Sequence, residues 1–200
     1  MLTKNIKEMK AVIDAHRAAD LLLQGTYYEK DTGRGCFVGC LVKGNGVPEI
    51  AVKYGIPEPV TRILEHVFEN LPFSEAADFF SEIPRAIGKD GKDLSRVIWL
   101  FVAEMLQEMP WKITAEMQTV INGVNLLVSG GDWLEHEAND AAYAAMRFDN
   151  PIAAHIAFFA ANNQPYGICA AATSAIRVHE KGAELERQRA SILRLLRDAK

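Results

Sequence analysis

Three side chains near the N-terminus are of the types that cysteine-dependent enzymes use. His16 and Asp20 are four residues apart, so they would be neighbours on a helix, where an aspartate orients a histidine and raises its pKa. If Cys36 began a second helix, the helix dipole would lower the pKa of its thiol, and His16 could act as the base. This arrangement predicts a hydrolase or transferase with His16, Asp20 and Cys36 as catalytic residues, although the segment 37–39 (FVG) favours a strand over a helix.

His16 and Asp20 also have a structural interpretation. They continue an apolar stripe formed by Leu2, Ile6, Met9 and Ile13. Either the stripe turns to the helix surface after Ile13, or the two polar side chains form a buried hydrogen bond that holds the segment that follows. We favour this interpretation over catalysis, because ion pairs in structural networks resemble catalytic pairs.

Cys36 and Cys40 are the next candidates for chemistry. On a straight strand they would be roughly 13 Å apart, too far for a disulfide, whereas on a helix they would be adjacent and able to share a metal. His16 and His66 could then complete a set of zinc ligands, but the paired Cys-x-x-Cys spacing of structural zinc sites is absent. We therefore expect buried thiols, with no metal and no cofactor.

Two other motifs resemble known ligand sites but depart from their patterns. The glycines at 33, 35 and 39 resemble a phosphate-binding loop, but their spacing differs from a dinucleotide fingerprint and the Gly-Lys-Ser/Thr of a P-loop is absent. The segment 136–140 (HEAND) resembles the His-Glu-x-x-His zinc helix, with an aspartate in place of the second histidine. Turn glycines and solvated residues at the start of a helix explain both motifs.

The hydrophobic pattern predicts the elements that would position these residues. The stripe that begins at Leu2 predicts a helix to Gln24, ended by Gly25. A β-prone segment, a turn at 31–33 and the apolar segment that follows predict a β-hairpin over about residues 26–43.

Helical periodicity continues from the hairpin to the C-terminus. Apolar stripes at 60–71, 94–105 and 113–128 each match one face of a helix, and the second half of the chain is rich in alanine. No low-complexity linker divides the chain. We therefore predict a mainly α fold, a multi-helix bundle with one short N-terminal β-hairpin, as a single globular domain over residues 1–200.

The last helical segment, 185–196, carries charges of both signs. Mixed charge on a terminal helix is typical of a solvated face and does not indicate RNA binding. Its thin apolar edge is formed by Ile192, Leu195 and Leu196. We expect this edge to dock onto the core or onto a second copy, which would make the protein a homodimer through its C-terminal helix.

The composition argues against several classes of protein. A hydrophobic content of 49% with 24% charged residues argues against wholesale disorder, and the formal net charge of −4 gives no global attraction to nucleic acid. The first ten residues lack the apolar run of a secretory signal, and no segment reaches the about 20 apolar residues that span a bilayer. Three cysteines, an odd number, fit reduced thiols. We expect a cytoplasmic protein with no membrane association.

Several short strings resemble a family of uncharacterised bacterial and phage or prophage proteins. The strings are QGTYY at 24–28, GRGCFVGC at 33–40, YGIP at 54–57 and VFENLP at 67–72, and the alanine-rich stretch at 138–145 is similar to the second half of that family. The resemblance carries no established activity. It implies a mobile-element context, and proteins of mobile elements often act by binding host proteins.

The binding residues are expected where these strings, the turn glycines and the cysteines meet, namely at Tyr27, Tyr28, Arg34 and Cys40. The best interpretation is a protein-binding factor of mobile-element origin with a counter-defence or host-modulating role, whose partner is a host protein or a second copy. The alternative is the small cysteine-dependent hydrolase or transferase that uses Cys36, His16 and Asp20.

Overall fold

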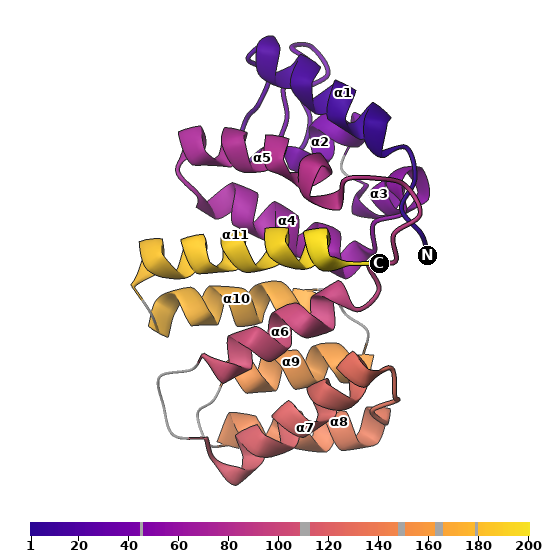
Figure 1. The fold of residues 1–200 in the computed structure, drawn as a ribbon. Helices are drawn as coiled ribbons and strands as arrows, with labels where there is room; N and C mark the ends of the chain where they lie inside the picture. Colours follow the sequence, from indigo (N-terminus) through magenta and orange to yellow (C-terminus); the bar gives the residue numbers. More distant parts are fainter. Residues whose placement is uncertain (45, 109–112, 148–150, 163–165, 179) are drawn as a thin grey trace. The chain divides into compact units, whose positions relative to one another are not determined.

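Helices form almost all of the regular structure of this protein (Figure 1). The computed structural model describes residues 1–44, 46–108, 113–147, 151–162, 166–178 and 180–200. Within those ranges it has eleven α-helices and no β-sheet, only isolated β-bridges. The prediction of a mainly α fold is therefore confirmed. Contacts between Cα atoms divide the chain into two compact units, Met1–Ser95 with Leu185–Lys200, and Arg96–Glu184.

The first unit contains five helices from the N-terminal half and most of the last helix of the chain. They are α1 (Ile6–Ala18), α2 (Phe37–Val42), α3 (Val47–Tyr54), α4 (Glu58–Asn70), α5 (Phe73–Ile87) and α11 (Lys181–Asp198). Helix α4 follows its predicted pattern closely. It starts at the Pro-Glu-Pro segment and buries the predicted stripe, whose members are Val60, Ile63, Leu64, Val67 and Phe68.

The predicted β-hairpin over residues 26–43 is not formed. The turn at 31–33 is present, because the Glu29 amide donates to the carbonyl of Arg34 and the Gly33 amide donates to that of Glu29. The expected return strand, however, is helix α2, and residues 37–41 of this helix are all buried. A short apolar segment that is buried on every side has neither the period of a strand nor that of a helix, so the pattern does not distinguish the two.

Helix α1 ends at Ala18, six residues before the predicted end at Gln24. Asp20 follows it with a left-handed backbone (φ 52°), the conformation that closes many helices. The Leu21 amide donates to the carbonyl of His16, and the Asp20 amide donates to that of Arg17. These two bonds are the Schellman pattern of a helix C-terminus, with aspartate in the position that glycine usually takes.

Three phenylalanine rings join α2, α4 and α5 at the centre of the first unit. The ring of Phe80 meets Phe37 edge-on at 5.7 Å between centroids, and meets Phe68 edge-on at 5.9 Å. All three side chains are fully buried. Such pairs add to the large hydrophobic contribution of buried aromatic rings, so this cluster fixes α2 against the two helices that follow it.

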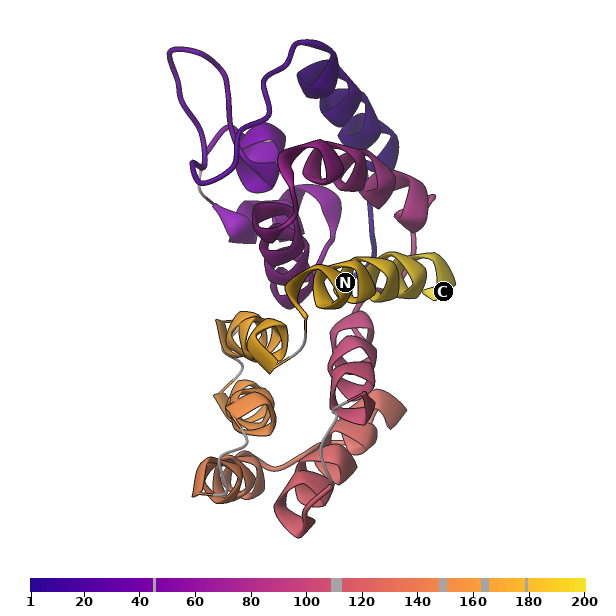
Figure 2. The same cartoon turned by 90° about the vertical axis from the view of Figure 1, so that its left-hand side faces the viewer.

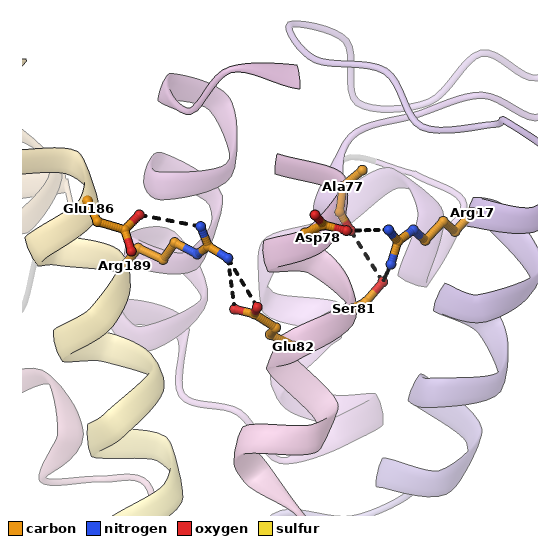
Figure 3. A network of polar contacts seen from close by, with 7 residues as sticks. All are labelled: Arg17, Ala77, Asp78, Ser81, Glu82, Glu186 and Arg189. Atoms are coloured by element: carbon orange, nitrogen blue, oxygen red, sulfur yellow. Dashed lines mark hydrogen bonds and ion pairs between the residues drawn. The ribbon is translucent and has the colours of Figure 1, made fainter. Parts of the chain in front are cut away.

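Ion pairs connect α5 to helices on either side of it (Figure 3). Arg17 of α1 pairs with Asp78 and donates to the hydroxyl of Ser81, while Arg189 of α11 donates to both carboxylate oxygens of Glu82 at 3.1 and 3.2 Å. The Arg17–Asp78 pair is exposed, and exposed ion pairs contribute little to stability. The Arg189 side chain is largely buried, and its two bonds to Glu82 connect α11 to α5.

The N-terminal segment and the C-terminus of the chain are both tied to the loop after α5. The amide of Thr3 donates to the carbonyl of Lys92 at 2.9 Å, and the Thr3 hydroxyl accepts from the Lys92 amide. The buried ammonium group of Lys92 donates to the carbonyls of Leu196 and Arg197 at 3.1 and 2.7 Å. These carbonyls lie in the last turn of α11, where a helix favours a positive charge.

Replacing Lys92 with methionine is expected to lower the free energy of unfolding by about 2 kcal/mol, because two charge-assisted hydrogen bonds to the end of α11 are lost. Urea denaturation followed by circular dichroism measures this change. The matched control is Lys89→Met in the same loop, whose exposed side chain makes no such bonds in the described structure. Equal stability of the two variants would contradict the role given to Lys92.

Within the described ranges, the second unit consists of five helices, of which the last three bury many alanines. They are α6 (Val97–Gln107), α7 (Ala115–Ser129), α8 (Glu135–Arg147), α9 (Pro151–Asn162) and α10 (Tyr166–Val178). Figure 2 shows α8, α9 and α10 nearly end-on, each packed on the next. The buried alanines of α8 are Ala138, Ala141, Ala142 and Ala145. Small side chains let neighbouring helices approach closely, which is why alanine recurs at these positions.

The apolar edge of α11 is buried within the chain. Ile192, Leu195 and Leu196 are at most 5% exposed, so the edge docks onto the protein itself, the first of its two predicted roles. None of the helices in the described ranges is both long enough and apolar enough to cross a lipid bilayer.

Candidate functional site

His16 and Asp20 do not form the pair that a catalytic base would need. Nδ1 of His16 lies 3.0 Å from the carbonyl oxygen of Val12, one turn earlier in the same helix. Asp20 lies outside the helix and is exposed. Because α1 ends between them, the four-residue spacing no longer makes them neighbours on one helix face. In the described ranges no hydrogen bond joins either residue to Cys36.

Cys36 stands directly before the first residue of α2, the position that the cysteine-dependent mechanism requires. The thiol is nevertheless only 2% exposed, and burial raises its pKa to about 11 despite the nearby amides of Gly39 and Val38. At neutral pH only about one thiol in ten thousand would then be ionised. Since the thiolate is the nucleophile, this environment works against catalysis by Cys36.

The other thiol of this segment is equally inert. Cys40 is buried and donates to the carbonyl of Gly35 at 3.2 Å, and burial raises its pKa to about 12. The prediction of buried thiols at Cys36 and Cys40 is therefore confirmed. Burial also lowers the pKa of His66 to about 4. Among the described residues, no three histidine, cysteine, aspartate or glutamate side chains come together as a metal site.

A pocket of about 230 Å³ opens beside Cys36. Its walls are formed by the loop before α2 and by the polar face of α4. The lining residues are Gly25, Thr26, Tyr27, Cys36, Glu65 and Glu69. The pocket thus contains two of the predicted site residues, Tyr27 and Cys36, and two carboxylates that were not predicted.

Hydrogen bonds from the loop to α4 fix one side of the pocket. The side-chain amide of Gln24 donates to the carbonyls of Phe68 and Leu71 at 2.6 and 3.0 Å, at the C-terminal end of α4. The backbone amide of Gly25 donates to Oε2 of Glu69 at 2.7 Å. The Gln24 bonds satisfy carbonyls at the end of α4, and the Gly25 bond holds the Gly25 backbone against Glu69.

Glycines in and before α2 fix the other side. The Cys36 amide donates to the carbonyls of Thr26 and Tyr27 at 3.0 and 3.1 Å. A Cβ atom on Gly35 or Gly39 would overlap the carbonyl oxygen of Tyr27. The glycines therefore allow the Tyr27 backbone to lie directly on α2, which positions the tyrosine side chain at the pocket.

The two carboxylates of the pocket differ in how their charge is balanced. Glu65 is paired with Arg62, which also pairs with Glu58 one turn earlier. The Tyr27 phenol is hydrogen-bonded to Glu65 and to Arg62, and its pKa is raised by burial first and by the charge of Glu65 second. The charge of Glu65 is thus compensated within the protein.

Glu69 has no such compensation. It accepts hydrogen bonds from the Gly25 amide and from the Cys36 thiol, and no basic side chain in the described part of the chain forms an ion pair with it. Burial is the main cause of the raised pKa of Glu69, and the charge of Glu65 adds to it. A half-buried carboxylate that faces a pocket without a cation is suited to binding a positively charged group.

The other predicted binding residues lie elsewhere. Tyr28 is half-buried and forms an isolated β-bridge with Gly35, and the buried Nε of Arg34 has no hydrogen-bond partner in the described structure. Cys40 lines a second pocket, of about 370 Å³, together with residues of α1 and α3. The structure therefore brings only Tyr27 and Cys36 to the pocket that contains Glu69.

Sequence reasoning missed Glu65 and Glu69. The available signal was their spacing: two like charges four residues apart on a helix repel each other, so the pair opposes helix stability and needs an explanation. What the spacing does not reveal is the burial of Glu69, because the loop that covers it lies 44 residues earlier in the chain.

Comparisons of this chain with protein-family models, with curated protein sequences and with solved structures found no match.

Proposed function

We propose that this protein is a binding protein of mobile-element origin that modulates a host protein, and that the Glu69 pocket receives a lysine or arginine side chain of its partner. The observation that carries this proposal is the half-buried carboxylate of Glu69, which lines the pocket and has no ion pair in the described structure. The strings that resemble phage and prophage proteins support the mobile-element context.

The dimensions and walls of the pocket suit one long basic side chain. A volume of about 230 Å³ is below the range typical of sites for drug-sized ligands. The ring of Tyr27, 38% exposed, offers a face for the aliphatic stem or for the charge of a lysine or arginine. The ammonium or guanidinium group would then meet Glu69 and regain the charge pairing that the carboxylate lacks within the protein.

Binding is favoured over cysteine chemistry for a physical reason. A hydrolase or transferase that uses Cys36 needs a thiolate and a base within hydrogen-bond reach. Burial disfavours the thiolate of Cys36, and the Nδ1 atom of His16 is directed to the carbonyl of its own helix. A half-buried carboxylate and an exposed aromatic ring need no such activation to bind a cation.

The Glu69→Gln variant tests the proposal. Titration of n-propylguanidinium into labelled protein, followed by the NMR shifts of the Gly25 and Cys36 amides, should give saturable binding that the variant weakens by about tenfold or more. The control is Glu75→Gln, at an exposed position of α5, which should bind as the natural protein does. Saturable binding of equal strength to the Glu69→Gln variant, or none to the natural protein, would refute the proposal.

A loss of cation binding in the Glu69→Gln variant should not be caused by unfolding of that variant. A glutamate whose pKa is raised on folding destabilises the folded state as the pH rises through that pKa, so the Glu69→Gln variant should be at least as stable as the natural protein at neutral pH. Protonation of Glu69 removes the charge that binds the cation. Because the pKa of Glu69 is raised, the natural protein should lose cation binding as the pH falls, within a range above the ordinary glutamate value of 4.5.

A further inference from the structure

The second unit carries an apolar pocket between α8 and α9. Its volume is about 200 Å³, and the lining residues are Met146, Pro151, Ala154, His155 and Phe158. Burial lowers the pKa of His155, so this imidazole is neutral at physiological pH and leaves the pocket without a fixed charge. The pocket is therefore suited to an uncharged, bulky side chain.

Two exposed side chains of α8 form apolar surface at the pocket, Met146 in its wall and Tyr143 beyond it. Met146 is 56% exposed and Tyr143, three residues earlier, is 57% exposed. The ring of Tyr143 meets Phe158 edge-on, with 5.4 Å between the centroids. Exposed aromatic and methionine side chains around a small pocket are typical of binding hot spots. Here they form one continuous patch, whereas single exposed apolar residues are common on any protein surface.

Acidic residues adjoin this surface at one end. Asp140 precedes Tyr143 by one helical turn, and Glu137 precedes Asp140 by another. Both are exposed, and in the described structure neither forms an ion pair. Helix α9 has no lysine or arginine with which to balance them. A partner that covers the pocket thus meets negative charge on the side toward the start of α8.

From this charge pattern we propose that the pocket between α8 and α9 is a docking site for a peptide segment of another protein, in which a bulky apolar residue is flanked by lysine or arginine. The apolar side chain enters the pocket beside Phe158, and the basic residue lies against Asp140. The proposal is independent of the Glu69 pocket in the first unit. A second copy of this chain is a less suitable occupant, because the apolar edge of its arginine-bearing helix α11 is buried.

Selection from a displayed random peptide library on the full-length protein tests this inference. Enriched peptides are expected to share a large apolar residue next to lysine or arginine. Binding of one synthetic enriched peptide, measured by fluorescence anisotropy, should weaken about tenfold in the Tyr143→Ala and Met146→Ala variants. It should weaken less, and lose part of its salt dependence, in the Asp140→Asn variant.

Two controls separate this site from others. Leu126→Ala removes an exposed apolar side chain of α7 (41% exposed) and should leave peptide binding unchanged. A peptide whose binding weakens in Glu69→Gln but not in Tyr143→Ala would occupy the Glu69 pocket and would overturn this proposal, so failure of the Glu69 proposal and failure of this one are distinguishable. Enrichment of peptides without the apolar–basic pattern, or self-association of the protein that Tyr143→Ala abolishes, would overturn the proposal.

Discussion

The Gly39→Ala variant is expected to lose about 2 kcal/mol of unfolding free energy and to lose cation binding at the Glu69 pocket. Alanine at a helical position normally stabilises a helix by up to about 1 kcal/mol relative to glycine. Here the added Cβ would overlap the carbonyl oxygen of Tyr27, so the loop must move and the bond from the Cys36 amide to that carbonyl is lost. Forced repacking of this kind costs about 1–3 kcal/mol.

Urea denaturation and the propylguanidinium titration measure the two effects on the same sample. The matched control is Gly44→Ala, since a Cβ at Gly44 would come no closer than 3.9 Å to another group, the Val42 carbonyl oxygen. That control should differ from the natural protein by no more than about 0.5 kcal/mol. If Gly39→Ala were as stable as the control and still bound the cation, the contact between the Tyr27 backbone and α2 would not position the pocket.

The Phe80→Ala variant is expected to lose about 3–5 kcal/mol, the range measured for buried phenylalanines in other proteins. Phe80 is fully buried and contacts both Phe37 of α2 and Phe68 of α4. Truncation therefore removes the ring that connects three helices and leaves a cavity at their centre. Thermal and urea denaturation followed by circular dichroism measure the loss.

Phe73→Ala is the control for this substitution, because Phe73 begins the same helix but is 46% exposed. It removes the same atoms at the surface and should cost less than about 1 kcal/mol. A similar loss in both variants would mean that the three rings do not form the centre of the core.

The α-helical character of the fold could be predicted because most helices carry an apolar stripe. In α4 the pattern from Val60 to Phe68 has the helical period and is bounded by prolines, and the structure has the helix there. The segment from Cys36 to Leu41 shows no such period, because it is apolar at nearly every position and all of its residues are buried. Its conformation depends on packing against Phe80, which no local pattern reveals.

The candidate site was predicted only in part, for a related reason. The sequence strings directed attention to the region around Tyr27 and Cys36, and both residues line the pocket. The chemistry assigned to Cys36 required an exposed thiol with a neighbouring base. Whether the thiol is exposed depends on segments that are distant in the sequence, and these bury it. Glu69 gains its raised pKa from the same long-range burial, so its role became visible only in the folded chain.

The most direct test of the Glu69 proposal is the pKa of that carboxyl group, measured from its side-chain ¹³C NMR shift with and without n-propylguanidinium. In the free protein the pKa should lie above the ordinary value of 4.5. Saturation with the cation should lower it, because a positive charge beside a carboxylate favours the ionised form. A pKa that does not change when the cation is added would contradict the assignment of this pocket to a basic side chain.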